Sequence, residues 1–176
     1  LVPNNKKSGC DPRQSGTYKN GYICEPCFVG TYSTTGAIKC IDSPAGTWTK
    51  QDKPHPDVEY NTSSGFYSCM AGRYSTSTKA TSSTTCVKCD MGKFSTAIGA
   101  GSSDTCNDCA PGKYNPIEGG NLSTSCLDCE DGKVSTLFGA TICISCTGNL
   151  VPNNKKSGCD PCQSGTYKNG YICEPC

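Results

Sequence analysis

The sequence has little of the apolar material from which a hydrophobic core is built. Aromatic residues make up 8% and all apolar types 34% of its 176 residues, and histidine occurs once. No apolar run approaches the roughly 18 residues that a membrane span requires. The 16 basic and 15 acidic residues nearly cancel, and no run of like charge exceeds the pair Lys6 and Lys7 and its copy Lys155 and Lys156. We therefore expect no membrane span in this segment and no nucleic-acid partner.

Cysteine, glycine and proline are abundant instead. The chain holds 17 cysteines, 20 glycines and 11 prolines. A chain that cannot bury a sufficient core needs covalent cross-links, and glycine and proline favour short strands joined by turns. We predict an all-β fold of small disulfide-rich repeats, arranged as an elongated solenoid or rod of stacked short β-hairpins with little hydrophobic core.

Residues 1–27 recur almost unchanged as residues 150–176. The two segments are identical at 26 of 27 positions, and Cys162 replaces Arg13 in the second. The offset of 149 residues defines one long repeat over residues 1–149, and residues 150–176 begin the next. We interpret the chain as a segment of a longer tandem array, and we expect any secretion signal or anchor to lie outside it.

A shorter motif runs through the long repeat. CxxC is followed by two residues, a glycine, a small or basic residue and an aromatic residue, most clearly at 27–32, 89–94 and 109–114. Eight such units make up residues 1–149, and the longest, residues 44–69, is an irregular unit that we expect to be disulfide-free. A single small unit is marginal alone, so we expect stacked neighbours and cross-links to hold it.

We predict that each unit is a small β-hairpin. The clearest case is residues 17–23, and residues 166–172 repeat it. In both copies an Asn-Gly pair, Asn20-Gly21 and Asn169-Gly170, supplies the positive φ angles that a two-residue turn requires.

Two disulfide pairings are natural for such an array. One lies within each CxxC, and the other joins the second cysteine of one unit to the first cysteine of the next. Ser43 stands where one second cysteine is expected, and Phe66 stands where the following first cysteine is expected. Between-unit pairing makes these two positions partners that are lost together, whereas pairing within CxxC leaves Cys40 and Cys69 without partners.

We therefore predict between-unit disulfides. The pairs are Cys27–Cys40, Cys69–Cys86, Cys89–Cys106, Cys109–Cys126, Cys129–Cys143, Cys146–Cys159 and Cys162–Cys173. Of the remaining cysteines, periodicity places the partners of Cys10 and Cys176 outside the segment, and Cys24 faces Arg13 as the one internal cysteine without a partner. Closing a loop of about 15 residues contributes about 3 kcal/mol in the chain-entropy model, so we expect the cross-links to dominate stability.

Zinc is the alternative use of these cysteines. Two sets of four have the spacing of a four-thiolate zinc site. The sets are Cys86, Cys89, Cys106 and Cys109, and Cys126, Cys129, Cys143 and Cys146. The paired loss at positions 43 and 66 and the single histidine favour disulfides. We expect no cofactor other than glycans.

Two acceptor sequons for N-glycans are present, at Asn61 and Asn121. Such matches often stay unused in cytosolic chains, but they gain weight beside many disulfides. Sugars would protect exposed backbone from proteases and cover strand edges that otherwise aggregate.

The irregular unit carries the only tryptophan, Trp48, and the only histidine, His55. One interpretation is a hinge or a lateral contact between rods, with Trp48 as the aromatic anchor. The interpretation that we favour is that Trp48 and Phe66 bury enough surface to replace the missing cross-link.

We predict no enzymatic activity. The one histidine lies between Pro54 and Pro56 without a plausible nucleophile beside it, and the acidic residues are scattered along expected turns. A thioredoxin-like use of CxxC requires a helix in a βαβ context, which the pattern does not predict.

The pattern over residues 24–40, CxxC followed by two residues, Gly-Thr-Tyr-Ser and a further cysteine, resembles the ephrin-receptor-like cysteine-rich repeat. More distantly, it is similar to tumour-necrosis-factor-receptor modules and to the CxxC-rich surface antigens of protists. The resemblance covers nearly the whole chain. It implies an extracellular, elongated β-ladder and no particular ligand.

Two functions stay open. The first is an extracellular or cell-surface structural protein that forms a glycosylated, disulfide-laddered filament or surface coat, with further copies of itself as partners. The near-exact long repeat favours it, because a fibre needs identical units and a binding site does not. The alternative is the cysteine-rich ectodomain of a membrane-anchored surface antigen or receptor that binds a protein ligand.

Overall fold

The computed structural model describes residues 15–21, 23–50 and 66–176. These residues form strands of two to four residues and three single-turn 3₁₀ segments, and they contain no α-helix. The strands pair two by two, and seven disulfides have both cysteines within these described ranges. The predicted class, an all-β chain of small disulfide-rich repeats, is confirmed.

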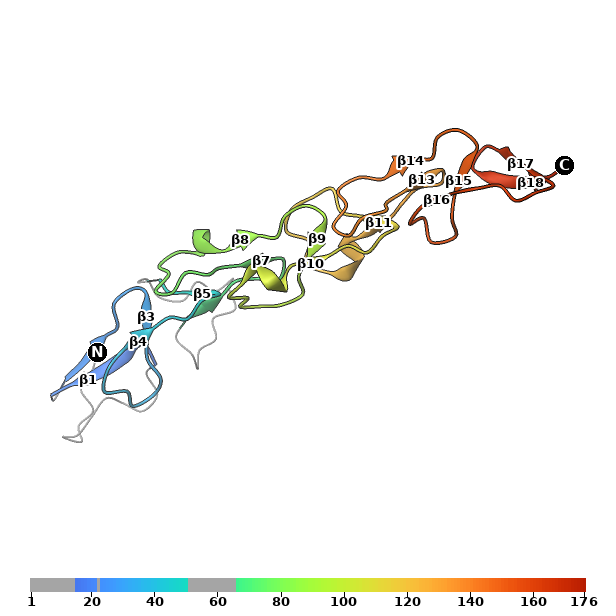
Figure 1. Cartoon of the computed structure of the whole chain (residues 1–176). Helices are drawn as coiled ribbons and strands as arrows, with labels where there is room; N and C mark the ends of the chain where they lie inside the picture. Colours follow the sequence, from blue (N-terminus) through green and yellow to red (C-terminus); the bar gives the residue numbers. More distant parts are fainter. Residues whose placement is uncertain (1–14, 22, 51–65) are drawn as a thin grey trace. The chain divides into compact units, whose positions relative to one another are not determined.

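Consecutive strands form each two-stranded sheet, and Figure 1 colours them in chain order. The pairs are β1 (Thr17–Asn20) with β2 (Ile23–Pro26), β3 (Thr31–Tyr32) with β4 (Ile41–Asp42), β5 (Thr47–Trp48) with β6 (Tyr67–Ser68), β7 (Arg73–Tyr74) with β8 (Val87–Lys88), β9 (Lys93–Phe94) with β10 (Asn107–Asp108), β11 (Lys113–Tyr114) with β12 (Leu127–Asp128), β13 (Lys133–Val134) with β14 (Ile144–Ser145), β15 (Leu150–Pro152) with β16 (Cys159–Pro161) and β17 (Thr166–Asn169) with β18 (Ile172–Pro175).

The longest hairpins, β1–β2 and β17–β18, lie where the sequence predicts them, but the turn is shifted by one residue. Asn169 is the last residue of its strand and pairs with Ile172, so Gly170 and Tyr171 form the turn. Gly170 has φ +63°. Glycine with positive φ at the first central position is the requirement of a type II′ turn, and the asparagine is therefore a strand residue.

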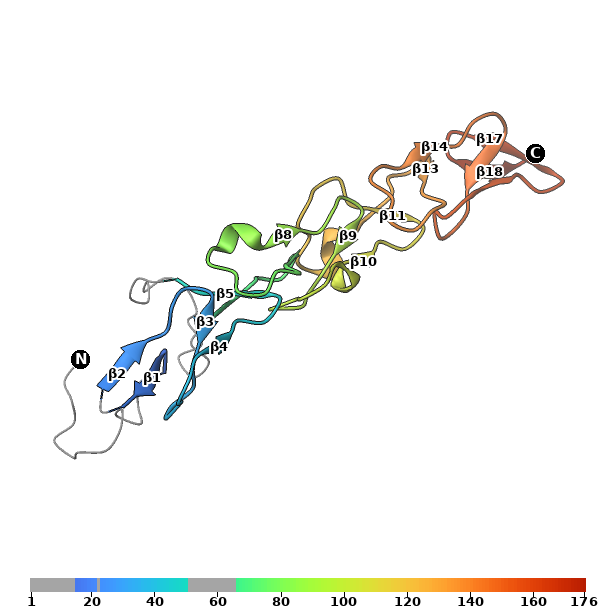
Figure 2. The ribbon, with the colours of Figure 1, turned by 60° about the vertical axis from the view of Figure 1, so that its left-hand side comes forward.

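The 3₁₀ segments are η1 (Ser83–Thr85), η2 (Ser103–Thr105) and η3 (Ser123–Ser125). Each ends directly before the first cysteine of a CxxC, and Figure 2 shows η1 just before β8. Ser82 caps η1 by accepting a hydrogen bond from the Thr84 amide at 3.2 Å. Serine and threonine thus shape the return from the long loop of a hairpin to its second strand.

Contacts divide the chain into two units. The first consists of Leu1–Met70, Tyr74–Val87 and Ile98–Ser103, and the second of Ala71–Arg73, Lys88–Ala97 and Asp104–Cys176. Both units are built from the same kind of hairpin.

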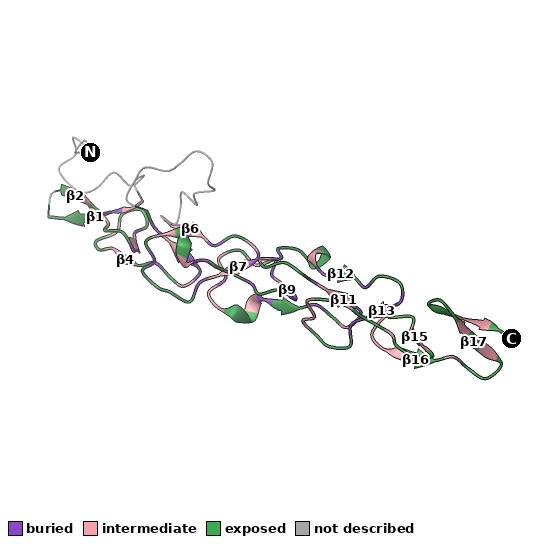
Figure 3. Ribbon diagram, turned by 90° about the horizontal axis from the view of Figure 1, so that it is seen from above, coloured by how far each residue is buried: buried purple, intermediate pink, exposed green. Residues whose placement is uncertain are grey.

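Little apolar surface is buried in the described residues, as the sequence predicts. Buried residues are short stretches between exposed ones in Figure 3. Apart from cysteines and the alanines Ala80 and Ala100, the buried apolar side chains are those of Tyr67 and Val134. Small polar residues, chiefly serine and threonine, occupy much of the remaining interior. Disulfides and backbone hydrogen bonds therefore replace a conventional core.

Candidate functional site: the contact between successive hairpins

Seven disulfides link successive hairpins, each from the second cysteine of one unit to the first cysteine of the next. They are Cys27–Cys40, Cys69–Cys86, Cys89–Cys106, Cys109–Cys126, Cys129–Cys143, Cys146–Cys159 and Cys162–Cys173. These are the same seven pairs that the degenerate units indicate in the sequence. Their Cα–Cα distances, 5.5–5.8 Å, are those of ordinary disulfides.

Two further cysteines have a defined state. Cys24 is disulfide-bonded, so the expectation that it is left without a partner opposite Arg13 is wrong. Cys10 and Arg13 lie outside the described residues. Cys176 is a free and exposed cysteine. Sequence periodicity missed the state of Cys24 because it assumed that each cysteine keeps its partner position when the partner is substituted.

All eight cysteines of the two candidate zinc sets are in disulfides in this structure. A disulfide sulfur cannot act as a thiolate ligand. Within the described ranges, no three His, Cys, Asp or Glu residues are grouped so that they could hold a metal ion.

Most hairpins are closed by a hydrogen bond between the second cysteine of the unit and the motif glycine. The Cys89 amide donates to the Gly72 carbonyl at 2.9 Å, and the Cys109 amide donates to the Gly92 carbonyl at 2.8 Å. The same bond recurs throughout, from Cys27 to Gly16 and from Cys176 to Gly165 among others. It places the start of each unit beside the end of its second strand.

The motif glycine also binds the next hairpin through its own amide. Gly72 donates to the Ser95 carbonyl and Gly92 donates to the Asn115 carbonyl, both at 2.8 Å. Ser95 and Asn115 are the fourth residues of the following Gly-x-aromatic-x motif. The motif glycine therefore closes its own hairpin through its carbonyl and binds the following hairpin through its amide.

The fourth residue of the motif continues the contact. The Ser95 amide donates to the Gly120 carbonyl at 2.9 Å, and the Asn115 amide donates to the Ala140 carbonyl at 3.0 Å. These acceptors lie in the long loop of the next hairpin. Small residues occupy most acceptor positions, because a larger side chain would meet the preceding hairpin.

The motif glycines from Gly30 to Gly112 lie too close to the backbone of another hairpin to carry a side chain. A Cβ on Gly92 would lie 2.0 Å from the carbonyl oxygen of Gly139, and one on Gly46 would lie 2.1 Å from that of Gly99. Both glycines also have positive φ, +80° and +79°. Glycine is thus required twice, once for its conformation and once for the close approach of the neighbouring loop.

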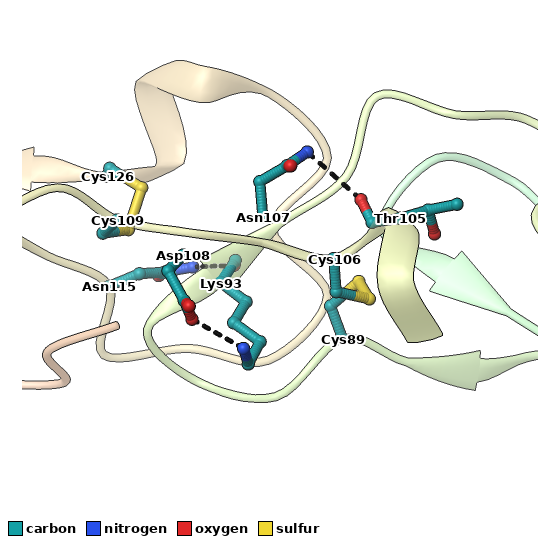
Figure 4. A network of polar contacts seen from close by, with 9 residues as sticks. All are labelled: Cys89, Lys93, Thr105, Cys106, Asn107, Asp108, Cys109, Asn115 and Cys126. Carbon is teal, nitrogen blue, oxygen red and sulfur yellow. Dashed lines mark hydrogen bonds and ion pairs between the residues drawn. A yellow bond between two sulfur atoms is a disulfide. The ribbon is translucent and has the colours of Figure 1, made fainter. Parts of the chain in front are cut away.

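In the hairpins from β3–β4 to β13–β14, the fourth residue of the motif is serine or threonine, except in β11–β12, where it is Asn115. Its side chain is fully buried. The Nδ2 group donates to the Lys93 carbonyl at 2.9 Å, and Oδ1 accepts from the Ile117 amide at 3.2 Å. Figure 4 shows Asn115 reaching Lys93, with the Cys89–Cys106 and Cys109–Cys126 disulfides nearby.

Ser43 has the backbone contacts of a second cysteine. Its amide donates to the Gly30 carbonyl at 2.9 Å, and its carbonyl accepts from the Lys79 amide at 3.0 Å. Its side chain is fully buried, and its hydroxyl has no hydrogen-bond partner within the described residues. Ser43 therefore occupies the position of the second cysteine of its unit, as the spacing of the units in the sequence indicates.

Two aromatic contacts lie near the missing cross-link, and each involves a tyrosine that sequence reasoning missed. Trp48 stacks on Tyr67 with ring centroids 4.4 Å apart, and Phe66 meets Tyr32 edge-on at 4.9 Å. Tyr67 is buried, whereas Trp48 and Phe66 are half-buried. The period-two register of β5 and β6, which places Trp48 opposite Tyr67, could have indicated the first pair. His55 lies outside the described residues.

In each of two adjacent hairpins, a lysine on the first strand faces an aspartate on the second strand. Lys93 Nζ lies 2.6 Å from Asp108 Oδ1, and Lys113 Nζ lies 2.5 Å from Asp128 Oδ1 (Figure 4 shows the first pair). Both are directly paired cross-strand positions. The Lys113 hydrogen bond and charge lower the pKa of Asp128. These groups are largely exposed, so they favour the strand register more than they add to stability.

The first hairpin carries a different polar pair. Tyr18 donates from its hydroxyl to Glu25 Oε2 at 2.7 Å, and Asn20 donates to Glu25 Oε1 at 2.9 Å. These two hydrogen bonds lower the pKa of Glu25, and the bond to Glu25 raises the pKa of Tyr18. Tyr167 and Asn169 make the matching contacts to Glu174 in the second copy.

The predicted acceptor Asn121 is exposed and lies just before η3. An oligosaccharide at this position would meet solvent. The other predicted acceptor, Asn61, lies outside the described residues.

Large apolar side chains project from the long hairpin loops. They include Ile38, Ile98, Ile117, Leu137, Phe138 and Ile142, each at least 64% exposed. Because the hairpins are too thin to cover them, these side chains are available to other molecules.

No helical segment in the described part of the chain has the length and hydropathy of a membrane span. No protein-family model matches the chain, and no curated protein is significantly similar to it. The repeated hairpin contact is therefore the main structural basis for assigning a function.

Proposed function

We propose that this chain belongs to an extracellular structural protein that forms a glycosylated, disulfide-laddered filament or surface coat. The coarse part of the assignment follows from the structure, because many disulfides indicate an oxidising compartment outside the cytosol. The resemblance to ephrin-receptor-like cysteine-rich repeats is part of the same proposal.

One observation carries the structural role: the same contact is repeated along the chain with little variation. Except at Ser43, where the cross-link is missing, a disulfide joins each hairpin to the next, and backbone hydrogen bonds accompany it in most of these contacts. Backbone contacts do not depend on most side chains, so the array can be extended by adding units. The near-identity of residues 1–27 and 150–176 indicates that the long repeat is itself the element that is multiplied.

The experiment is a length series. Chains with one, two and three copies of residues 1–149 are secreted from a eukaryotic host and measured by small-angle X-ray scattering and negative-stain microscopy. A structural rod predicts that the maximum dimension grows by a constant increment with each copy. Globules whose dimension grows only with the cube root of mass would contradict the proposal.

A second candidate is the ectodomain of a membrane-anchored antigen or receptor that binds a protein ligand. The apolar side chains exposed on the long loops, such as Ile98, Leu137 and Phe138, favour it. This candidate predicts a membrane anchor in the full-length gene and divergence among successive long repeats. A gene that encodes near-identical repeats without an anchor would support the filament instead.

A further inference from the structure

The disulfides give this chain a covalent path that is shorter than its backbone. Cys106 is bonded to Cys89, Cys109 is bonded to Cys126, and only the two residues of β10 lie between Cys106 and Cys109, as Figure 4 shows. Tension on the chain therefore passes from one disulfide along β10 to the next disulfide. The backbone from Cys89 to Cys106, a separation of 17 residues, carries no load, because the disulfide joins its two ends.

The same bypass recurs from Cys27 to Cys173 with one exception. Every cysteine in this range is bonded to a cysteine of the neighbouring unit. The sequence holds no cysteine between Cys40 and Cys69, and Ser43 and Phe66 stand at the two positions that would pair. In this range, it is only at this contact that tension must follow the backbone around a whole hairpin, from Ser43 to Phe66.

Noncovalent contacts hold this hairpin, β5–β6, closed. Its strands pair at two positions. The Cys69 amide donates to the Gly46 carbonyl at 2.8 Å, and Trp48 stacks on Tyr67 with ring centroids 4.4 Å apart. The two strands of an antiparallel hairpin enter and leave on the same side, so tension separates these contacts one after another instead of loading them together. Such a hairpin opens while the disulfides beside it stay intact.

The flanking hairpins keep the ends of the opened segment in place. The Gly46 amide donates to the Ser75 carbonyl at 2.7 Å, so β5 is also bound to the following hairpin. Disulfides lie on both sides of the segment, Cys27–Cys40 and Cys69–Cys86. Because these cross-links survive the opening, the segment refolds between two folded neighbours when the tension falls.

We propose that the backbone from Ser43 to Phe66 is an extensible link in a chain whose other hairpins are bypassed by disulfides. Phe66 follows Ser43 by 23 residues, so opening the hairpin lengthens the covalent path by about 75 Å. The biological use of the link rests on the proposed filament. One link in each long repeat of 149 residues lets the filament lengthen under load and recover without breaking a covalent bond.

Single-molecule force spectroscopy of the full, non-reduced chain tests the link. Handles are attached through enzymatic peptide tags at both termini, so no new thiol is introduced. We expect one opening step that adds about 75 Å of contour length and reverses on relaxation. The Ser43→Cys, Phe66→Cys double variant, purified in its cross-linked form, should lose this step and keep the rest of the trace. Each single variant should retain the step.

A second variant tests whether the disulfide bypass is the reason that other hairpins do not extend. The Cys109–Cys126 disulfide spans 17 residues, so Cys109→Ser with Cys126→Ser should add a new step of about 55 Å. The proposal is overturned by a non-reduced native chain without a step near 75 Å, by a cross-linked double variant that keeps it, or by a Cys109→Ser, Cys126→Ser chain without a new step.

The length series and the force measurement fail independently of each other. Multimers that form globules while the single chain still shows the reversible step would refute the filament and leave the link standing. Multimers that lengthen by a constant increment while the single chain shows no step would refute the link and leave the filament standing.

Discussion

The side chain of Asn115 occupies the space that a side chain at position 120 would need. A Cβ on Gly120 would lie 2.8 Å from Asn115 Nδ2 and 2.8 Å from the Lys93 carbonyl oxygen. Two neighbouring hairpins have serine and alanine at these positions, as Ser95 with Ala100 and Ser135 with Ala140. The larger Asn115 is thus accompanied by the smaller Gly120, where the other two hairpins pair serine with alanine.

This complementarity predicts a strong coupling between the two positions. Gly120→Ala alone should destabilise by about 1–3 kcal/mol through overpacking, and Asn115→Ser alone by about 1 kcal/mol through the lost bond to Lys93. The double variant has the Ser and Ala pair of the neighbouring hairpins. It should therefore be about 1–2 kcal/mol more stable than the sum of the two single-variant effects predicts. Denaturant titrations of the non-reduced chain measure the cycle, and strict additivity would contradict the contact.

The close approach of the motif glycines can be separated from their conformation. Gly92 and Gly165 have nearly the same φ, +80° and +82°, but only Gly92 faces a neighbouring backbone oxygen within 4 Å. Both alanine variants should lose about 1–2 kcal/mol of folding free energy, because alanine is strained in the left-handed conformation. Gly92→Ala should lose about 2 kcal/mol more, because its Cβ meets the Gly139 carbonyl.

Thermal unfolding of the two glycine variants under oxidising conditions gives the comparison. Gly165→Ala is the matched control, since open space surrounds its Cβ position. Equal losses in the two variants would show that the neighbouring loop does not restrict position 92.

The vacant cross-link between β5–β6 and the preceding hairpin should be restorable. Ser43 and Phe66 occupy the positions of Cys89 and Cys106 two hairpins later. Replacing both by cysteine should form one additional disulfide and add about 2–3 kcal/mol, reduced somewhat by loss of the Phe66–Tyr32 contact. Thiol titration and melting of the double variant check this, with each single variant as the control. Two titratable new thiols in the folded double variant would refute the assignment.

The first hairpin should respond to alkaline pH. Glu25 raises the pKa of Tyr18 in the folded chain, so the contribution of this pair is complete below the pKa of an unfolded tyrosine and is lost as pH rises through the folded value. Amide exchange of β1 and β2 measured from neutral to alkaline pH should show the loss. Tyr18→Phe should remove that pH dependence, and an unchanged dependence in this variant would exclude Tyr18 as its source.

Acid pH should weaken a different hairpin. Lys113 lowers the pKa of Asp128, so this pair stabilises β11–β12 above the pKa of an unfolded aspartate and loses its contribution as pH falls through the folded value. Asp128→Asn should flatten the acid dependence of amide protection in these strands. Protection that still falls with the same slope in the variant would assign the effect to another group.

Disulfide pairing was accessible from the sequence because the units fail in a correlated way. Ser43 and Phe66 interrupt the pattern at two positions that are partners under only one scheme, and the seven pairs follow from it. The hairpin positions were also accessible, since a Gly-x-aromatic segment precedes most of the long loops. The state of Cys24 was not, because a periodic scheme assigns no partner when one residue departs from the period.

The interior was harder to predict. Aromatic residues are conventionally placed in a core, but in this chain Tyr32 and Tyr114 are only half-buried, while Ser95 and Asn115 are fully buried. Between adjacent two-stranded hairpins there is space chiefly for small side chains, and most larger ones lie at the surface. Sequence patterns for strands assume a sheet with a broad face, which this fold does not have.

Peptide mapping of the intact, non-reduced chain tests the central claim most directly. Proteolysis followed by mass spectrometry should recover cross-linked peptides that join the second cysteine of each unit to the first cysteine of the next, such as Cys89 with Cys106 and Cys109 with Cys126. Recovery of peptides in which Cys86 is bonded to Cys89, or Cys106 to Cys109, would contradict the account, as would stoichiometric zinc with free thiols.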